Sequence, residues 1–284
     1  MRGNMRIIHT DQIIENIREM CIEANLGLAD DVKRRILSAG ETEASVLGKR
    51  ILGQLEENLE IAAADRIPIC QDTGMTVVFL NIGQDVHIEG RAVEDAVNEG
   101  IRQGYRDGYL RKSVVDDPLL RTNTGDNTPG IIHYGIVPGE NIEITIAPKG
   151  FGSENMSRIV MLKPADGMEG VKNTVLETVR LAGPNACPPM VIGVGIGGDF
   201  EKCAILAKKA LTRSLDEPSA YPHIRSLEEE LLREINETGI GPGGLGGRTT
   251  ALGLNIEIYP THIAGLPVAV NICCHVNRHV KRVL

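Results

Sequence analysis

Residues 190–213 read MVIGVGIGGDFEKCAILAKKALTR, and this stretch decides the fold class. Its first part, 190–195, is short and apolar, which predicts a buried strand. A glycine-rich turn follows, and residues 200–213 then repeat apolar side chains at helical spacing. A strand that leads directly into a helix is a building block of α/β proteins. The stretch therefore predicts an α/β fold of mixed helices and strands.

The same alternation extends outward in both directions. The first third of the chain is predicted to be helical, with one apolar face running from Ile13 to Ala24. Apolar patterns predict further helices at 45–64, 91–109, 168–181 and 227–238, and strands at 76–82, 250–258 and 267–272. Residues 131–137 and 141–147, separated by Pro-Gly-Glu, are typical of a β-hairpin. No polar linker interrupts the pattern, so we expect one domain over residues 1–284.

The helix expected at 91–109 carries a strip of small residues. They recur every four positions, at Ala92, Ala96, Gly100, Gly104 and Gly108. Each glycine destabilises a helix by about 1 kcal/mol relative to alanine. We therefore expect another element to pack closely against this strip, which is a structural feature rather than a ligand site.

Composition excludes several classes of protein. The chain has 30 basic and 38 acidic side chains and a net charge of −8, so an extended nucleic-acid surface is not expected. No apolar stretch approaches the roughly 20 residues that span a bilayer. Residues 1–6 lack the pattern of a signal peptide. These features predict a cytoplasmic protein without a membrane partner.

Two glycine-rich stretches are similar to the phosphate-binding loops of nucleotide-binding proteins. Residues 193–198 satisfy GxGxxG, but the polar, helical stretch 215–237 replaces the second strand and its acidic end. A tight strand-to-helix turn is therefore favoured, and a Rossmann-type nucleotide-binding subunit is the weaker alternative. Residues 241–250, GPGGLGGRTT, lack the GK[ST] ending of a phosphate loop. Their backbone N–H groups leave an anionic ligand such as a carboxylate open.

The six cysteines fall into two groups. No CxxC pair is present, and the expected compartment favours reduced thiols. Cys21 and Cys203 lie on apolar helix faces, as small buried hydrophobic residues do. Three others stand in loops rich in Pro, Gly or polar residues: Cys70, Cys187 and Cys274. Three thiolates on one iron–sulfur cluster leave one iron without a protein ligand, able to act as a Lewis acid. Spacing alone does not establish such a cluster.

Several motifs occur together in a fixed order. They are ICQDTG at 69–74, KGFGSEN at 149–155, and GPGGLGGRTT at 241–250 followed by THIA at 261–264. With these motifs the chain resembles the iron–sulfur (class I) fumarate hydratase family, in its alpha subunit or N-terminal domain. The related L-tartrate dehydratases share the resemblance. It extends from about residue 68 to residue 279, which is nearly all of the chain beyond the first helices.

The resemblance implies a set of site residues carried on Gly/Pro-rich loops. Cys70, Cys187 and Cys274 match the three ligands of a [4Fe–4S] cluster, and the family pattern favours Cys274 over the adjacent Cys273. The substrate-binding positions that match are Gln71, Asp72, Arg111, Gly152 and His262. Asp72 and His262 are the matching catalytic residues. Phe151 and Glu154 depart from the family pattern, which makes the contact at Gly152 the least secure.

The resemblance also implies an activity and a partner. We expect reversible hydration of fumarate to L-malate, with a small dicarboxylate as substrate. L-tartrate dehydratase and mesaconate hydratase are the alternatives within the same chemistry. In the family, a C-terminal domain or separate beta subunit completes the site, so we expect a hetero-oligomer with a beta subunit. A non-catalytic iron–sulfur or zinc-stabilised assembly subunit is a further alternative.

Overall fold

The computed structural model describes residues 5–284, which divide into two compact units. The described part of the first unit comprises residues 5–29, 61–151 and 278–284, and the second comprises 30–60 and 152–277. Residues 1–4, which belong to the stretch searched for a signal peptide, lie outside the described residues. Helices and strands alternate in both units, so the predicted α/β class is confirmed. The prediction of one domain over residues 1–284 stays a prediction.

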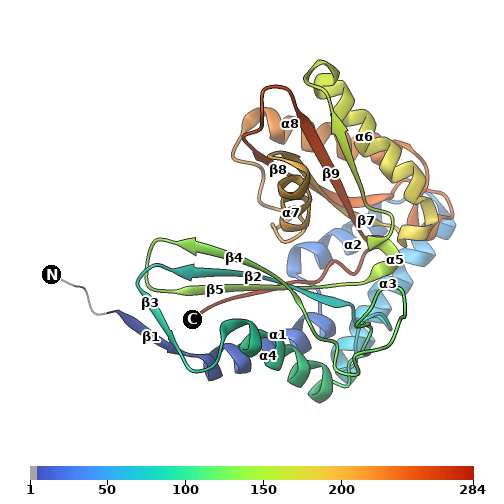
Figure 1. Ribbon diagram of the computed structural model, residues 1–284. Helices are drawn as coiled ribbons and strands as arrows, with labels where there is room; N and C mark the ends of the chain where they lie inside the picture. Colours follow the sequence, from blue (N-terminus) through green and yellow to red (C-terminus); the bar gives the residue numbers. More distant parts are fainter. Residues whose placement is uncertain (1–4) are drawn as a thin grey trace. The chain divides into compact units, whose positions relative to one another are not determined.

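The first unit is built on a four-stranded sheet in the order β10-β5-β2-β4. Its strands are β2 (Met75–Gly83), β4 (Ile131–Val137), β5 (Ile142–Lys149) and β10 (Val280–Val283). Helices α1 (Thr10–Leu26) and α4 (Val93–Asp107) lie together on one side of this sheet in Figure 1. Aliphatic side chains from both helices, β2 and β5 form the core between these layers. A two-stranded parallel sheet pairs β1 (Arg6–His9) with β3 (Val86–Glu89).

The hairpin predicted over residues 131–147 is wrong in its pairing. Both strands form, but β2 lies between them, parallel to β4 and antiparallel to β5. Val78 stands opposite Ile132 on one side and Ile146 on the other. Because β2 is buried along most of its length, a central place satisfies it, whereas the more exposed β4 takes the edge. The local pattern identified the strands but not their neighbours.

The small-residue strip on α4 is confirmed as a packing surface. A Cβ at Gly100 would stand 2.8 Å from the carbonyl oxygen of Ile14, and one at Gly104 would stand 2.8 Å from that of Arg18. Both oxygens belong to α1. Any larger side chain would force the two helices apart, so the glycines permit a close crossing that offsets their low helix propensity.

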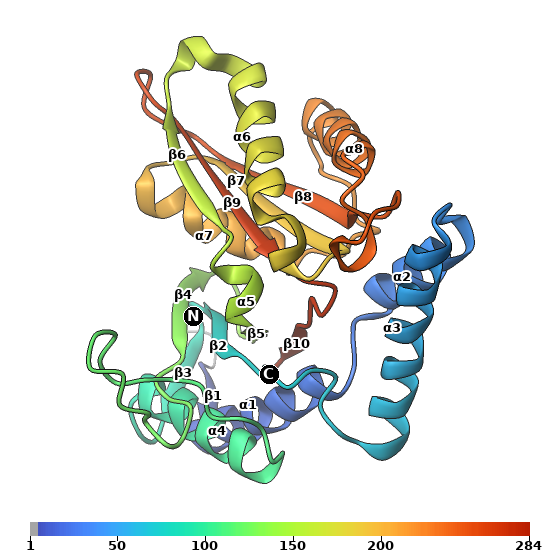
Figure 2. The same ribbon diagram turned by 90° about the vertical axis from the view of Figure 1, so that its right-hand side faces the viewer.

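The second unit contains a four-stranded sheet in the order β6-β9-β7-β8. Its strands are β6 (Arg158–Leu162), β7 (Met190–Gly197), β8 (Ala251–Tyr259) and β9 (Leu266–Cys273). Helices α6 (Gly167–Ala182) and α8 (Pro222–Glu237) cover one face, and α7 (Phe200–Ala210) covers the other (Figure 2). Residues 30–60 of this unit form α2 (Asp30–Thr42) and most of α3 (Val46–Asp65).

The glycines of the GxGxxG stretch allow α7 to lie directly on β7. A Cβ at Gly193 would stand 2.1 Å from Ala207 O, and one at Gly195 would stand 2.0 Å from Cys203 O. The Asp199 side chain caps α7 by accepting the Lys202 N–H at 2.8 Å. Close helix–strand packing thus accounts for these glycines without a bound nucleotide.

The sequence pattern missed the shortest elements. Strands β1, β3, β6 and β10 each have four or five residues, too few for a clear alternation. Helix α2 was not distinguished from its helical surroundings. Over the part of the chain that the structure describes, no helix has both the length and the apolar character needed to cross a bilayer.

Candidate active site

In the first unit, Cys70 begins a tight turn, residues 70–74, that leads into β2. The half-buried Cys70 Sγ accepts the backbone N–H of Asp72 at 3.4 Å. It also lies 3.3 Å from Oε1 of Gln71, whose side chain is exposed. The turn therefore presents Cys70 as a potential ligand rather than as a core residue.

Two buried side chains hold the end of this turn. The Tyr105 hydroxyl, on α4, lies 2.7 Å from Thr73 O and 2.9 Å from Gly74 O. Asn127 Nδ2 donates to Gly74 O at 3.1 Å, and Asn127 Oδ1 accepts the Ser113 N–H at 2.7 Å. Burial raises the pKa of Tyr105, so its hydroxyl remains a donor at neutral pH. These contacts fix the backbone on which Cys70 is carried.

The same turn is connected to two arginines. Thr73 Oγ1 donates to the carbonyl oxygen of Arg111 at 2.9 Å, which places the Arg111 segment beside the turn. The Arg111 side chain is exposed. Arg278 donates through Nη2 to Asp72 O and through Nε to Pro148 O, the latter at 3.3 Å. The structure thus gathers the predicted Cys70, Gln71, Asp72 and Arg111 in one part of the first unit.

The Asp72 carboxylate joins the turn to the segment that follows β5. Its Oδ1 accepts the Gly74 N–H at 3.0 Å, and its Oδ2 accepts the Phe151 N–H at 3.0 Å. A Cβ at Gly150 would stand only 3.0 Å from the same Oδ2. Two backbone donors therefore orient the carboxylate, and each oxygen retains a second lone pair for another partner.

Two buried cations near the turn have unused donors. Lys149 is 3% exposed and Arg278 is 2% exposed. Within residues 5–284, neither Lys149 Nζ nor Arg278 Nη1 has a hydrogen-bond partner. Lys149 stands opposite Met75, the first residue after the turn. A buried cation without a partner is unfavourable, so the surroundings of the turn suit an anionic group.

In the second unit, the structure brings Cys187 and Cys274 to the same end of the sheet, where β7 begins and β9 ends. Cys187 is exposed and ends the short helix η2 (Gly183–Ala186) with a left-handed φ of 52°. Cys274 follows the last residue of β9, whose Cys273 stands opposite Val191 of β7. His275 Nδ1 lies 3.1 Å from Cys187 O and links the two loops. Since that oxygen is an acceptor, Nδ1 carries the proton.

The two adjacent cysteines differ in accessibility. Cys273 is 4% exposed, and its Sγ lies 4.0 Å from Val276 O. Cys274 is half-buried. Successive residues at a strand end point to opposite sides, so only one of the two thiols is presented outward. This difference supports Cys274 over Cys273 as the candidate ligand.

His262 lies at the other end of the same sheet. It stands in the turn between β8 and β9, where its Nδ1 accepts the Ala264 N–H at 3.1 Å. Eight residues of β9 separate this turn from Cys274, and at about 3.3 Å per residue they span roughly 25 Å. His262 instead lines a cavity of about 600 Å³ with Lys202 and Tyr259. Within this unit, the structure does not bring His262 to the cysteine pair.

Gly152 is exposed in α5 (Phe151–Glu154). A Cβ there would meet open space, so packing within the chain does not require glycine. Glu154 forms an ion pair with Lys208 and accepts from Asn271 Nδ2 at 3.0 Å. The unusual glutamate therefore has a structural role.

The sequence left open an anionic ligand on the backbone of loop 241–250, and the structure shows several of these backbone donors already occupied. The Gly243 N–H donates to Pro188 O at 2.8 Å. The N–H groups of Arg248 and Thr249 both donate to the carboxylate of Glu43. The Glu43 side chain therefore occupies donors that the sequence had left open for an external carboxylate.

Comparison with known proteins decides the family. The model of the family described as fumarate hydratase (Fumerase) matches residues 14–283. The chain belongs to this family. It is 43% identical over 279 residues to a Methanocaldococcus jannaschii protein provisionally named L(+)-tartrate dehydratase subunit alpha, covering 96% of this chain and 98% of the relative. It is 30% identical over 254 residues to the L(+)-tartrate dehydratase subunit alpha of Escherichia coli strain K12, covering 88% and 84%.

Membership of the Fumerase family confirms the resemblance inferred from the motifs and supports an iron–sulfur hydro-lyase family of alpha subunits. The family implies an iron–sulfur cluster. Within residues 5–284, no three His, Cys, Asp or Glu side chains form a group that could hold a metal ion. The ligand set Cys70, Cys187 and Cys274 therefore remains a prediction.

Sequence reasoning missed the residues that support this Fumerase-family site. Tyr105 and Arg278 lie far from Cys70 in the sequence, and only the fold reveals their contacts with the turn. Asn127 belongs to the NTGDNTP stretch at 123–129, whose density of turn residues was the available signal. The unpartnered ammonium of Lys149 carries no sequence signal beyond its place in KGFGSEN.

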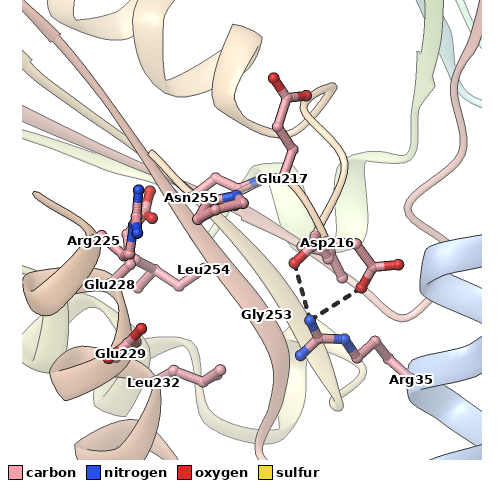
Figure 3. A pocket seen from close by; sticks show the side chains of 12 residues that line it. Arg35, Asp216, Glu217, Arg225, Glu228, Glu229, Leu232, Gly253, Leu254 and Asn255 are labelled. Atoms are coloured by element: carbon pink, nitrogen blue, oxygen red, sulfur yellow. Dashed lines mark hydrogen bonds and ion pairs between the residues drawn. The ribbon is translucent and has the colours of Figure 1, made fainter. Parts of the chain in front are cut away.

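A second cavity, of about 370 Å³, lies along β8 and contains none of the predicted site residues (Figure 3). Arg35, on α2, lines this cavity and donates to Leu215 O at 2.9 Å and to Asp216 Oδ1 at 3.2 Å. Glu228, on α8, accepts from Arg213 and from the Ile256 N–H. Arg35, Asp216 and Glu228 thus have hydrogen-bond partners within the second unit.

Proposed function

We propose that this chain is the alpha subunit of a hydro-lyase that hydrates fumarate reversibly to L-malate. In this proposal, Cys70, Cys187 and Cys274 hold a [4Fe–4S] cluster. The observation that carries it is the accessibility of these three loop thiols, in contrast to the buried Cys21, Cys203 and Cys273. The unpartnered Lys149 ammonium supports an anionic group beside the Cys70 turn. When bound, the cluster supplies a Lewis-acidic iron that lacks a protein ligand.

Arg111 is the proposed carboxylate-binding residue. Its guanidinium is exposed, while the Thr73 hydroxyl holds its backbone beside the Cys70 turn. A guanidinium binds a carboxylate through two parallel hydrogen bonds. Gln71 offers an amide donor from the same turn, and Gly152 offers a backbone without a side chain. Together these groups would orient a small dicarboxylate.

Asp72 is the proposed proton-transfer residue. The Gly74 and Phe151 N–H groups hold its carboxylate in one orientation. A second lone pair on each oxygen is available for a proton taken from, or returned to, a substrate carbon. Positioning by backbone rather than by flexible side chains suits a group whose geometry decides the rate.

His262 requires a different arrangement. It lies roughly 25 Å along β9 from the cysteine pair, too far for both to contact one small substrate. If His262 binds and acts on a substrate, as its motif implies, it does so away from the cysteine pair of its own chain. A beta subunit is the proposed partner that completes the site, supported by relatives named as alpha subunits. Those names also make L-tartrate dehydratase the second candidate function.

The first test is an anaerobic reconstitution with iron and sulfide, followed by absorption spectroscopy and metal analysis. We expect wild type and Cys273→Ala to bind a cluster, and we expect Cys274→Ala to bind none. Equal loss in both variants would contradict the assignment of Cys274. A colourless, iron-free wild type would overturn the cluster proposal.

A substrate panel on the reconstituted chain with its beta subunit tests the reaction. The proposal expects fumarate and L-malate to be interconverted. Rapid dehydration of L-tartrate without turnover of fumarate would replace the proposed reaction with the second candidate.

A further inference from the structure

A buried carboxylate lies between α2 and α3, outside every motif described above. Glu43 is 1% exposed, although glutamate is almost never buried without a partner. Its Oε1 accepts the Ser45 N–H at 2.9 Å, at the start of α3. Burial alone would raise the pKa of Glu43, but backbone hydrogen bonds outweigh it and lower the pKa to about 2. The side chain is therefore a carboxylate across the physiological range.

The other partners of Glu43 lie in the glycine-rich loop. Its two oxygens accept the Arg248 N–H, each at 2.9 Å, and Oε2 accepts the Thr249 N–H at 2.8 Å. A Cβ at Gly247 would stand 2.8 Å from Oε1, and the φ of Gly247 is +127°. Glycine is needed there both for its conformation and for the close approach of the carboxylate. Glu43 thus holds one end of the loop.

The other end of the loop contacts the segment that carries Cys187. The Gly243 N–H donates to Pro188 O at 2.8 Å. A Cβ at Gly244, which has a φ of +72°, would stand 2.3 Å from Cβ of Pro184. Pro184 O in turn accepts the Cys187 N–H at 3.1 Å. The loop therefore touches the Cys187 segment on both sides of the cysteine.

We propose that Glu43 is a positioning residue for Cys187, acting through loop 241–250. The carboxylate fixes the loop by its Arg248 and Thr249 N–H groups, and the loop fixes the Cys187 segment at Pro184 and Pro188. This inference rests on the proposed function only in taking Cys187 as a cluster ligand. It adds a residue that contacts neither the substrate nor the cluster but maintains one ligand in place.

The first experiment measures amide hydrogen exchange on the full-length, cluster-free chain. Glu43→Gln keeps the shape of the side chain but removes its charge and one acceptor oxygen. Weakening a hydrogen bond to a charged group increases the population of the locally opened backbone by roughly tenfold or more. We expect exchange to accelerate by about that factor in 241–250 and also in 183–189, while exchange in α7 stays unchanged.

A matched control separates positioning from general destabilisation. Asp31 is another buried carboxylate of the same unit, which accepts the Leu215 N–H at 2.6 Å and the Ser214 hydroxyl at 2.9 Å. Within residues 5–284, its hydrogen bonds go to Val32, Ser214 and Leu215 and none goes to loop 241–250 or to the Cys187 segment. We expect Asp31→Asn to leave exchange in 183–189 at the wild-type rate. Acceleration confined to 241–250 in Glu43→Gln would overturn the proposal.

A glycine pair provides a second test if Glu43→Gln does not fold. Gly247→Ala places a Cβ against Glu43, whereas Gly246→Ala, also at positive φ, meets open space. Both changes strain the backbone, but only Gly247→Ala displaces the carboxylate. We expect faster exchange in 183–189 for Gly247→Ala alone. Equal effects in both variants would show that backbone strain, not Glu43, controls the segment.

A chelator assay on reconstituted protein links the effect to the cluster. We expect iron release to be several-fold faster in Glu43→Gln than in wild type or Asp31→Asn. If wild type binds no iron while the exchange result holds, the proposed function fails and the positioning contact stands. If wild type binds iron and Glu43→Gln shows wild-type exchange and release, the positioning role fails alone.

Discussion

The Phe151 N–H donates to Asp72 Oδ2 at 3.0 Å and so joins two motifs that are 79 positions apart in the sequence. Gly74 fixes the other carboxylate oxygen. The orientation of Asp72 is consequently set by backbone atoms alone, which side-chain substitutions at Gln71 or Phe151 leave in place. This arrangement makes the role of Asp72 separable from its surroundings by mutation.

Asp72→Asn tests the proton-transfer role. The amide keeps the size of the side chain but cannot take up a proton, and its NH2 group faces a backbone donor. We expect kcat to fall by about 10²–10⁴-fold while the cluster absorption of the reconstituted protein persists. Steady-state kinetics with the beta subunit provide the measurement. A variant with a full cluster and nearly unchanged kcat would remove Asp72 from the proton path.

Arg111→Lys tests carboxylate binding. Lysine keeps the charge but loses the planar pair of donors, so we expect KM for the dicarboxylate to rise by roughly 10-fold or more, with a smaller change in kcat. Arg106→Lys is the control, because Arg106 is exposed in the same unit and pairs with Asp107. An equal rise in KM for both variants would indicate a general charge effect instead of a specific contact.

Lys149→Met should separate stability from ligand binding. Removing a buried cation without a partner is expected to raise the free energy of unfolding of the cluster-free chain by about 1–4 kcal/mol. The same change should weaken cluster retention or substrate affinity, because the anion loses its neighbouring charge. Urea unfolding and iron titration measure the two effects. A fall in stability of the cluster-free chain would mean that Lys149 already has a favourable environment there.

Tyr105→Phe tests the support of the Cys70 turn. Losing the hydroxyl leaves Thr73 O and Gly74 O without this donor, so we expect the free energy of unfolding to fall by about 1–3 kcal/mol at pH 7. Burial raises the pKa of Tyr105 in the folded chain. Its stabilising contribution is therefore complete below the unfolded pKa, near 10, and declines as the pH rises above it.

The difference in the free energy of unfolding between wild type and Tyr105→Phe should accordingly become smaller above about pH 10. Urea titrations at a series of pH values measure it. Because the buried Cys21 thiol is present in both proteins, its own ionisation largely cancels in the comparison. If the difference in the free energy of unfolding between the two proteins stays constant through pH 11, the hydrogen bonds donated by the Tyr105 hydroxyl do not stabilise the fold.

Glu43 should give the opposite dependence at acid pH. Its folded pKa of about 2 lies below the ordinary value of 4.5, so its contribution is present above pH 4.5 and is lost as the pH falls toward 2. The shift corresponds to roughly 3 kcal/mol. Between pH 5 and pH 2, the free energy of unfolding of wild type should fall by about this much more than that of Glu43→Gln. Parallel acid curves for the two proteins would contradict the carboxylate contacts.

Local patterns predicted the elements better than their arrangement. The apolar runs 76–82 and 190–195 were identified as buried strands because burial on both faces leaves a continuous signal in the sequence. The place of β2 between β4 and β5 depends on contacts between segments, and the intervening Pro-Gly-Glu favoured the wrong pairing. Small residues on α4 were interpreted correctly, because glycine in a helix requires a close neighbour.

The site residues named from the motifs stay a prediction, and the residues that support the Cys70 turn were not predicted at all. Cys70 and Asp72 belong to the ICQDTG motif, and the fold places the segment that carries Arg111 beside it. Tyr105 and Glu43 have ordinary sequence surroundings, and their importance comes from hydrogen bonds to backbone atoms far along the chain. His262 shows the converse. Its motif is clear, yet the length of β9 separates it from the cysteine pair.

The first unit draws its last strand from residues 278–284, after the second unit has been completed in the sequence. Arg278, which donates to Asp72 O, comes just before β10. During synthesis from the N-terminus, the ribosome therefore releases the Cys70 turn long before the arginine that secures it. The turn is therefore fully supported only after Arg278 has been synthesised, so a group bound at Cys70 would meet the finished turn only once the sequence of the second unit is complete.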